Sequence, residues 1–245
     1  MTQEIFQRTE LLIGSDGLKK LAGSHVLIIG VGGVGAFAAE FIARAGVGKI
    51  TIADGDEVAE SNCNRQLLAL HSTLHKRKTA VMKQRLLDVN PDLQVVEIDK
   101  FIEADDLPEL LTCGKIDFVV DAIDSVGVKC ALIVACQNHN LPIVSSMGAA
   151  GRLAPEKLKI AKLGKTNYCM LAKAVRSGVK KLGGHLETLA VYSDEDIREN
   201  MSQLATFTDV GGGQRVVPGT ISYLPAAFGG LCASVCIRHL LEKSV

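Results

Sequence analysis

The sequence contains no tryptophan, and aromatic residues of all kinds make up only 4% of its 245 residues. No two cysteines are separated by two residues, so the sequence predicts no zinc site of the paired-cysteine type. An odd number of cysteines without a secretory leader favours reduced thiols over a disulfide framework. The seven cysteines are Cys63, Cys113, Cys130, Cys136, Cys169, Cys232 and Cys236.

Excess charge of either sign is also absent, because 27 basic residues balance 27 acidic residues. A chain with this balance is no indiscriminate nucleic-acid binder. The first ten residues are polar and lack the apolar core of a signal peptide. The apolar stretch 224–237 is short and glycine-rich for a membrane span, and it predicts a buried helix instead. We therefore expect a cytoplasmic protein with no membrane span.

What the sequence does contain is a glycine-rich turn, because residues 25–35 read HVLIIGVGGVG. Glycine suits a turn whose backbone must approach a phosphate closely, and the helix predicted after it directs its positive dipole end at an anion. A second predicted strand, 49–53, leads into Asp54, whose carboxylate can accept hydrogen bonds from ribose hydroxyls. The sequence therefore predicts an adenine-nucleotide pocket, in which the glycines of the turn are Gly30, Gly32, Gly33 and Gly35.

The segment after the second strand helps to identify the ligand. A turn of this kind commonly holds a dinucleotide such as NAD, which needs no cations just beyond the ribose carboxylate. Here Arg65 and Lys78 follow, with Asn62 beside them, and such groups neutralise linked phosphates and stabilise a departing pyrophosphate. The alternative is that Arg65 and Lys78 are solvated surface charges. We favour an ATP pocket that also includes Asp56 and Gln66.

Two further aspartates, Asp121 and Asp124, follow the strand predicted over 116–120. Open α/β sheets bind ligands at the carboxyl ends of their strands, so we include Asp121 among the nucleotide-binding candidates. Asp124 can hold magnesium, since that ion takes one or two carboxylates together with phosphate oxygens. The alternatives are a helix N-cap for Asp124 and a structural loop residue for Asp121.

At this point the chain resembles the ubiquitin-activating-like adenylyltransferases, which include the molybdopterin- and thiamine-pathway activators. The resemblance rests on the GVGGVG turn, the run DGDEVAESNCNRQ, Lys78 and the run VDAIDS. It implies an enzyme that uses ATP and Mg²⁺ to adenylate a carboxylate, with Asp54 on the ribose. It also implies phosphate contacts by Arg65 and Lys78, metal binding by Asp124, and a homodimer in which Arg8 reaches the partner's active site.

Later motifs resemble one branch of this superfamily, the tRNA threonylcarbamoyladenosine dehydratases. They are the run over 120–155, then KLGKT, AVYSDE and GTISYLPAAFGGLCASVCI, and the likeness covers about 8–241. It implies a tRNA substrate carrying threonylcarbamoyladenosine, whose activated carboxylate closes a ring with net loss of water. The chain departs from the branch at Asn167-Tyr168-Cys169-Met170, where an acidic residue and a proline are expected after KT.

A basic stretch follows the predicted nucleotide pocket and is the candidate RNA surface. No acidic residue lies between its first and last members, so it can follow a phosphate backbone. The alternative is a solvated helical face. Few aromatic residues are available for base stacking, and Tyr168 and Tyr192 are the plausible ones. The basic residues are Lys157, Lys159, Lys162, Lys165, Lys173, Arg176, Lys180 and Lys181.

Alternating strands and helices predict a Rossmann-like α/β fold, an open and mostly parallel sheet with helices on both faces. We expect one domain, with an ATP-binding core over 1–151 and a substrate-side cap with a C-terminal helix over 152–245. The predicted strands are 25–29, 49–53, 94–98, 116–120, 141–145 and one near 186–192. The predicted helices are 36–45, 75–89, 105–113, 127–139 and one from about 225, with a polar turn at 211–213.

Two other functions stay open at this stage. One is an adenylyltransferase that activates the C-terminal glycine of a small sulfur-carrier protein, which would require a sulfur-relay partner. The other is a nicotinamide-dependent oxidoreductase or a non-catalytic nucleotide-binding regulator. An oxidoreductase or a regulator would have no role for Arg65 and Lys78, whereas ATP-dependent adenylation uses both.

Overall fold

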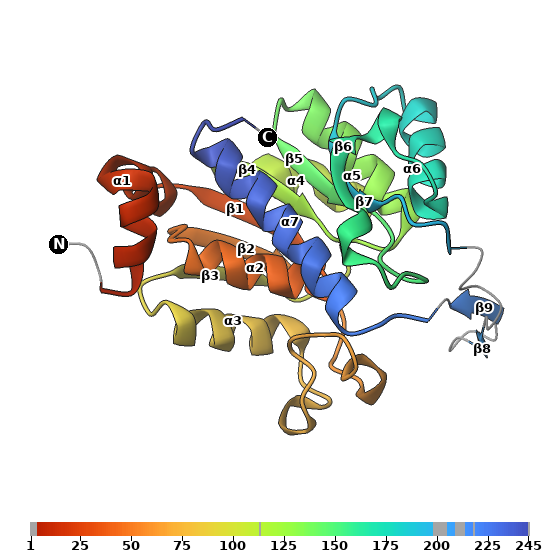
Figure 1. Ribbon diagram of the computed structural model, residues 1–245, viewed down its shortest axis with the longest axis horizontal. Coiled ribbons are helices and arrows are strands. Elements are labelled where there is room, and N and C mark those ends of the chain that lie inside the picture. Colours follow the sequence, from red (N-terminus) through yellow and green to blue (C-terminus); the bar gives the residue numbers. More distant parts are fainter. Residues whose placement is uncertain (1–3, 113, 198–204, 209–213, 218, 245) are drawn as a thin grey trace.

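The computed structural model describes residues 4–112, 114–197, 205–208, 214–217 and 219–244. The polar turn expected at 211–213 lies outside the described residues. The fold is a seven-stranded sheet covered by helices, which confirms the predicted Rossmann-like class (Figure 1). Its strands are β1 (His25–Ile29), β2 (Lys49–Ala53), β3 (Gln94–Ile98), β4 (Phe118–Asp121), β5 (Ile143–Ser146), β6 (Leu158–Lys162) and β7 (Leu189–Ser193).

The sheet runs in the order β3-β2-β1-β4-β5-β7-β6, and every neighbouring pair is parallel except β6 with β7. Strand order reverses between β1 and β4, so the connections leaving these two strands diverge. A crevice at the carboxyl end of the sheet is expected at such a switch point. Gly30 follows β1 and Asp124 lies just beyond β4, so the topology brings these two predicted residues to the same crevice.

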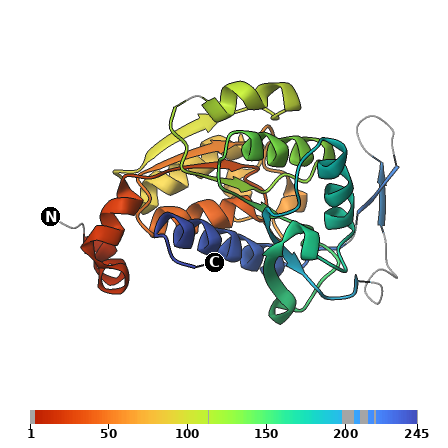
Figure 2. The same cartoon turned by 90° about the horizontal axis from the view of Figure 1, so that it is seen from above.

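Helices cover both faces of the sheet. Alternate side chains of each strand point to opposite faces, and each face packs into its own hydrophobic core. On β1, Val26 and Ile28 face one cluster with α2, α3 and α7, while Leu27 and Ile29 face the other with α4, α5 and α6 (Figure 2). All five residues of β1 are buried, as expected for a central strand. The helices are α1 (Gln7–Ala22), α2 (Gly35–Arg44), α3 (Lys78–Val89), α4 (Leu107–Thr112), α5 (Val126–Asn138), α6 (Met170–Lys181) and α7 (Tyr223–Leu240).

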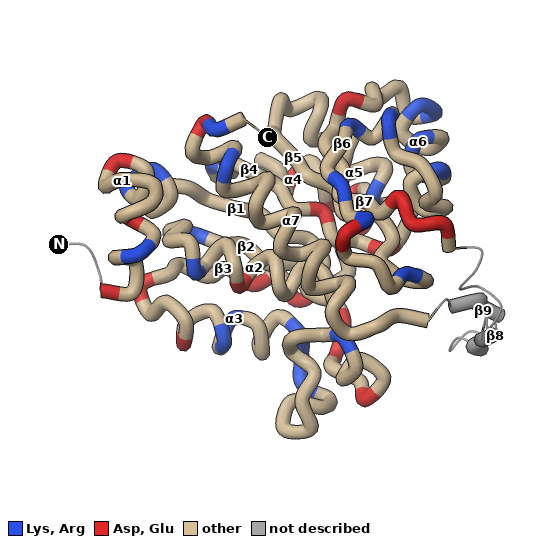
Figure 3. The backbone as a smooth tube through the Cα atoms, viewed as in Figure 1, with Lys and Arg blue, Asp and Glu red and all other residues tan. Residues whose placement is uncertain are grey.

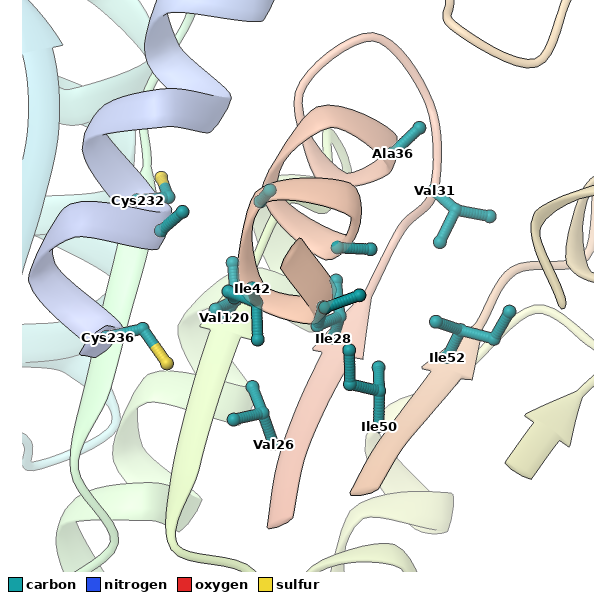
Figure 4. Packing of buried hydrophobic residues seen from close by; sticks show 14 of the residues in the cluster. Val26, Ile28, Val31, Ala36, Ile42, Ile50, Ile52, Val120, Cys232 and Cys236 are labelled. Carbon is teal, nitrogen blue, oxygen red and sulfur yellow. The ribbon is translucent and has the colours of Figure 1, made fainter. Parts of the chain in front are cut away.

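The predicted C-terminal helix is α7, which packs along α2 on one face of the sheet. Its residues Cys232 and Cys236 lie within the cluster formed by Val26, Ile28 and Val120 (Figure 4). The last element of the chain therefore completes the core that the first strands begin. No helix of the described residues has both the length and the apolar character needed to cross a membrane.

Several elements were not predicted. Helix α1 carries a non-helical residue, Gly14, with φ +77° and ψ 167°, and its residues Leu11 and Leu12 are exposed, so no apolar face marks it in the sequence. Strand β6 and helix α6 were not predicted either, whereas β7 corresponds to the strand expected near 186–192. Both β6 and β7, from the segment expected to form a cap, extend the main sheet. Strands β8 (Ala205–Thr208) and β9 (Gln214–Val217) pair with each other in a separate antiparallel ribbon.

The short 3-10 turns complete the secondary structure. They are η1 (Glu4–Phe6), η2 (Glu60–Asn62), η3 (His71–Thr73), η4 (Ala104–Asp106), η5 (Pro155–Lys157) and η6 (Leu163–Lys165). The helix predicted over 75–89 begins only at Lys78, because His75 has a left-handed backbone (φ +63°) that a helix does not accommodate. The remaining expected elements lie within a few residues of their observed bounds.

Candidate functional site

A cavity of about 610 Å³ opens at the carboxyl end of the sheet, at the switch point. It is formed by the loops after β1, β2, β3, β4 and β5, together with the starts of α6 and α7. Its size suits a ligand of nucleotide dimensions. The residues lining it include Gly30, Gly32, Gly33, Asp54, Asp56, Arg65, Gln66, Lys78, Phe101, Asp124, Met147, Leu171 and Pro225.

The glycines of the turn have different tasks. Gly30 has φ +89°, and a Cβ there would lie 2.7 Å from the carbonyl oxygen of Ala122. A Cβ on Gly35 would lie 1.7 Å from the carbonyl oxygen of Gly30, and Gly35 is not among the residues lining the cavity. A Cβ on Gly32 would meet nothing nearer than the Gln66 side-chain nitrogen at 3.7 Å. Gly30 and Gly35 therefore allow the turn to close, whereas Gly32 borders open space in the cavity.

Asp54 holds the loop after β2 against the glycine turn. Its Oδ2 accepts a hydrogen bond from the backbone N–H of Val31 at 2.8 Å, and its Oδ1 accepts one from the backbone N–H of Asp56 at 2.8 Å. The carboxylate also lines the cavity. Since each carboxylate oxygen has two lone pairs, Asp54 retains acceptor capacity toward a ligand.

Lys78 is the buried cation of the cavity. Its side chain is 5% exposed and its Nζ lies 2.7 Å from Oδ2 of Asp56, whose side chain is half exposed. Lys78 begins α3. The preceding residue, Arg77, does not line the cavity, and its Nε donates two hydrogen bonds to the Asp99 carboxylate, at 2.8 and 2.9 Å. The Arg77 hydrogen bonds lower the pKa of Asp99. These contacts fix the start of α3 so that Lys78 points into the cavity.

Arg65 and Gln66 line the cavity next to the glycine turn, where a Cβ on Gly33 would lie 3.6 Å from the Arg65 carbonyl oxygen. Arg65 donates from Nη1 to the Ser61 carbonyl and to the Asn64 side-chain oxygen, each at 2.8 Å. These acceptors are neutral, so the guanidinium charge is not cancelled by a carboxylate in the described part of the chain. Asn62 is not among the lining residues; its side-chain oxygen accepts from the backbone N–H of Ala59 at 3.1 Å.

The structure places Asp121 beneath the cavity rather than in it. Its side chain is 0% exposed and its Oδ2 lies 2.7 Å from Nζ of Lys129, which is also 0% exposed. Ser145 donates a hydrogen bond to the same oxygen at 2.5 Å. Oδ1 of Asp121 accepts from the backbone N–H of Ile123 at 3.1 Å, which orders the turn leading to Asp124. Asp121 therefore supports the cavity floor and has no surface open to a ligand.

Asp124 contrasts with Asp121, because its side chain is exposed and lines the cavity. Among the residues that the structure describes, no hydrogen bond or ion pair engages its carboxylate. Helix α5 begins at Val126 with Ser125 as its N-cap residue, so Asp124 is not the cap that the alternative interpretation required. The cavity thus combines the glycine turn with the cations Arg65 and Lys78 and with the open carboxylate of Asp124.

Comparison with known proteins agrees with this arrangement. The model of the ThiF family matches residues 6–245. The chain belongs to the ThiF family. A tRNA threonylcarbamoyladenosine dehydratase of Bacillus subtilis is 36% identical over 97% of this chain and 94% of that protein. The crystal structure of the E. coli tRNA N6-threonylcarbamoyladenosine dehydratase, TcdA, in complex with ATP superimposes with a TM-score of 0.85 at 31% identity, covering 98% of this chain and 94% of that chain.

The sulfur-carrier branch of the family is more distant. The E. coli sulfur carrier protein ThiS adenylyltransferase is 36% identical, but over only 58% of this chain and 56% of its own length. The dehydratases match the ThiF-family nucleotide core and also the segments that follow it. The similarity thus confirms the predicted family and favours the dehydratase branch.

One predicted catalytic residue of this ThiF-family chain lies far from the cavity. Arg8 is exposed on α1, which ends just before the amino end of β1, whereas the cavity lies at the carboxyl ends of the strands (Figure 1). Arg8 is not among the residues lining the cavity. Within one subunit the structure does not bring Arg8 to the other predicted site residues.

The basic stretch divides into two parts. On β6, Lys159 pairs with Asp194, and Lys162 lies 2.5 Å from Glu187. Arg176 donates to the Thr166 carbonyl at 2.9 Å. The other five are exposed and form no ion pair within the described residues, and most of them lie on or beside α6 (Figure 3). These five, which we call the free lysines, are Lys157, Lys165, Lys173, Lys180 and Lys181.

Within the described residues no cluster of three or more metal-ligating side chains occurs. Cys63 is exposed, whereas Cys169 is buried and accepts a hydrogen bond from the backbone N–H of Ala172 at the start of α6. Burial raises the pKa of Cys136 and Cys232 to about 12, so both thiols are protonated at neutral pH. Cys113 lies outside the described residues.

Sequence reasoning missed the apolar part of the cavity wall. Phe101 is 66% exposed and its backbone nitrogen would lie 2.4 Å from a Cβ on Gly55. The loop after β3 therefore packs closely on the loop after β2, at the side of the cavity where Asp54 lies. Met147 and Pro225 line other walls. Their only signal in the sequence is their position just after a strand or at the start of a helix.

Proposed function

We propose that this protein is an ATP-dependent tRNA threonylcarbamoyladenosine dehydratase. The observation that carries the proposal is the nearly full-length likeness to that branch. The cavity supports it, because it is lined by the glycine turn, by Arg65 and Lys78 and by the open carboxylate of Asp124. The substrate would be tRNA in which the threonylcarbamoyl group on an adenosine beside the anticodon offers a free carboxylate. The product is the cyclised nucleoside, with one water lost.

The cavity accommodates ATP with each part facing suitable groups. The glycine turn and the amino end of α2 face the phosphates, where backbone N–H groups and the helix dipole favour negative charge. Asp54 accepts hydrogen bonds from the ribose hydroxyls. The apolar wall at Phe101 covers the adenine ring, because an aromatic face stacks on a purine.

Asp124 fits a role in magnesium binding. It is a carboxylate without a partner in the described part of the chain, and it lines the same cavity as the glycine turn. Mg²⁺ is commonly held by one or two carboxylates with phosphate oxygens and water. A magnesium ion held there would neutralise part of the phosphate charge.

Adenylation follows from the position of the two cations. The substrate carboxylate attacks the α-phosphorus, an acyl adenylate forms, and pyrophosphate leaves. Arg65 and Lys78 stabilise the negative charge that builds up on the leaving group, in a cavity where such interactions are stronger than in water. Asp56 keeps Lys78 in place before the nucleotide arrives.

Ring closure needs no nucleophile from the protein. A nitrogen of the threonylcarbamoyl group attacks the activated acyl carbon, the bond to AMP breaks, and the nitrogen loses its proton. The two steps together convert ATP to AMP and pyrophosphate and remove one water from the nucleoside. The cavity acts mainly by holding the two reacting groups together.

We propose further that the active form is a homodimer in which Arg8 of one copy serves the other copy's cavity. Arg8 is exposed on α1, and the neighbouring Leu11 and Leu12 are 89% and 85% exposed. Apolar side chains this exposed on one helix suit burial against a second copy. Light scattering of the purified chain, with and without Leu11→Ser and Leu12→Ser, tests the oligomeric state.

The deciding experiment measures AMP and pyrophosphate release from ATP and Mg²⁺. Threonylcarbamoylated tRNA is compared with the same tRNA lacking the modification. We expect release only with the modified tRNA, together with loss of one water mass from the nucleoside. Release only with a small carrier protein ending in Gly-Gly would instead place the chain in the sulfur-carrier branch.

A further inference from the structure

An exposed tyrosine beside the cavity has no role in the nucleotide chemistry. Tyr168 is 55% exposed, in the loop between η6 and α6. The chain has three tyrosines. Tyr192 is 4% exposed, and the hydroxyl of Tyr223 donates to the Leu153 carbonyl at 2.8 Å. Within the described residues, only the Tyr168 ring combines wide exposure with a hydroxyl that makes no hydrogen bond to the protein.

The backbone of Tyr168 is fixed to the cavity wall in a strained conformation. Its φ is +46°, a left-handed value that non-glycine residues seldom adopt. Arg152, 3% exposed, donates from Nη2 to the Tyr168 carbonyl at 3.1 Å. Its Nη1 donates to the carbonyls of Gly148 at 2.6 Å and Ala150 at 3.1 Å, and both of these residues line the cavity. One buried guanidinium thus sets the position of Tyr168 relative to the cavity.

The residues around Tyr168 alternate between the cavity wall and solvent. A Cβ on Gly148 would lie 3.9 Å from Sγ of Cys169 and 3.7 Å from Cβ of Leu171, so these two residues pack on the wall. Met170, between them, is 69% exposed. Tyr168 and Met170 therefore present an aromatic ring and a flexible thioether side chain to solvent at the rim of the cavity.

Positive charge borders this apolar pair. Lys165 precedes it and Lys173 lies about one helical turn beyond Met170, and both belong to the free lysines. A flat ring next to unpaired cations is the combination with which proteins hold single-stranded nucleic acid, the ring against a base and the cations near the backbone. An acidic peptide would use the cations but would leave the ring without a planar partner.

We infer that Tyr168, flanked by Met170, is a stacking platform for an unpaired nucleobase of the RNA substrate. The inference rests on the proposed function, and it adds where a base of the anticodon loop lies while the threonylcarbamoyl carboxylate enters the cavity. The platform positions the substrate and touches no reacting atom. This role accounts for the left-handed backbone of Tyr168 and for the hydrogen bond that buried Arg152 donates to its carbonyl, because stacking requires the ring to keep one position.

Steady-state kinetics with modified tRNA give the first test. Tyr168→Ala raises the KM for tRNA by about tenfold or more, since stacking on one aromatic side chain accounts for an effect of that size. The KM for ATP and the kcat at saturating tRNA change little. Tyr168→Phe, which keeps the ring, restores the KM for tRNA. Leu182→Ala, an equally exposed apolar residue at the far end of α6, serves as the matched control.

A second variant separates the ring from the strain. Tyr168→Gly removes the ring but suits the left-handed backbone, so the fold is retained, which the melting temperature checks. It raises the KM for tRNA as Tyr168→Ala does. An unchanged KM in both variants, or an equal rise in Tyr168→Phe, overturns the platform.

Fluorescence tests the platform without turnover. The chain contains no tryptophan, so Tyr168→Trp introduces a single reporter that can itself stack. An anticodon stem-loop RNA carrying the modification quenches this fluorescence, whereas Tyr223→Trp, held near Leu153, shows a smaller change. Quenching of the Tyr168→Trp fluorescence supports the platform even if the wild-type protein does not cyclise the modified tRNA, a result that would contradict the dehydratase proposal. Turnover without quenching overturns the platform alone, and the absence of both contradicts both proposals.

Discussion

Arg65 is the residue whose removal most directly tests the phosphate chemistry. Its guanidinium lines the cavity and is held only by neutral oxygens, so its charge is available to the departing pyrophosphate. We expect Arg65→Ala to lower kcat/KM by roughly 10²- to 10³-fold, the size of effect seen when one group that stabilises developing charge is removed. Pyrophosphate release measured with saturating modified tRNA and a range of ATP concentrations gives this number as kcat/KM for ATP.

Lys76→Ala is the control for this experiment. Lys76 is exposed, lies two residues from Lys78 and is not among the residues lining the cavity. Its replacement removes a positive charge from the same region and leaves kcat/KM near the wild-type value. Equal activity of the Arg65→Ala and Lys76→Ala enzymes would show that Arg65 has no part in adenylation.

The buried pair of Asp121 and Lys129 supports the cavity floor. Both side chains are fully buried, so removing one leaves an uncompensated charge in the core. We expect Lys129→Met to lower the free energy of unfolding by about 3–5 kcal/mol. Urea unfolding measures this loss. The double variant Lys129→Met with Asp121→Asn recovers much of it, because no charge is then left buried.

The same pair shows where sequence reasoning reaches its limit at single residues. Asp121 ends the buried strand β4 and Asp124 follows it, and spacing alone could not tell which carboxylate faces the cavity. The answer depends on Lys129, eight residues later on α5, which draws Asp121 inward. Asn62 is a similar case, because its side chain stabilises its own turn. Asp121 and Asn62, which support the fold, could not be distinguished from the cavity-facing Asp124 without knowing where their side chains point.

The glycine turn is the element in which local shape and ligand binding can be separated. A methyl group on Gly35 would collide with the Gly30 carbonyl, whereas one on Gly32 would project into the cavity. We expect Gly35→Ala to prevent stable folding. Gly32→Ala should keep the melting temperature but weaken ATP binding by roughly 1–3 kcal/mol, because the backbone N–H groups no longer reach the phosphates. This corresponds to about a five- to 150-fold rise in Kd, measurable by calorimetry.

Strand β1 contains a titratable group that makes stability depend on pH. Burial lowers the pKa of His25, whose Nδ1 lies 2.7 Å from the Lys115 carbonyl and Nε2 lies 2.8 Å from the Thr51 hydroxyl. Above about pH 6.5 both folded and unfolded states carry a neutral ring. Below that, the unfolded state binds a proton first, so stability falls by at most about 1.4 kcal/mol per pH unit from this residue.

Urea unfolding of wild type and His25→Gln between pH 5 and 8 measures the contribution of this residue. The glutamine variant keeps hydrogen-bonding capacity and does not titrate, so it lacks this part of the slope. If both proteins show the same pH dependence, His25 is not the group responsible.

Elements with a strong pattern were predictable, and those defined by their neighbours were not. Strands β1, β2 and β4 are apolar runs because they are buried on both faces, and their positions follow from that pattern. Strand β6 is only half-buried at the sheet edge, and α6 has a lysine-rich outer face, so neither shows a continuous apolar signal. Their place depends on β7 and α5, which lie far apart in the sequence.

At the scale of the whole molecule, the question is where RNA lies on a chain with no net charge. All of the free lysines except Lys157 lie on or beside α6, whose first turn borders the cavity at Leu171 (Figure 3). The lysines of β6, by contrast, are neutralised by Asp194 and Glu187. A phosphate backbone is attracted to unpaired cations, and counterions are released as each phosphate is neutralised. We therefore expect RNA to follow one route, along α6 toward the cavity mouth.

Salt dependence of tRNA binding tests that route. Replacing Lys173, Lys180 and Lys181 with alanine should reduce the slope of log K against log salt by about 2, since each phosphate of single-stranded RNA that a lysine neutralises adds roughly 0.7 to the slope. The matched control is Lys159→Ala with Lys162→Ala, whose charges are already paired, and it should leave the slope nearly unchanged. An equal reduction per charge in both variants would mean that RNA responds only to overall charge and does not follow α6.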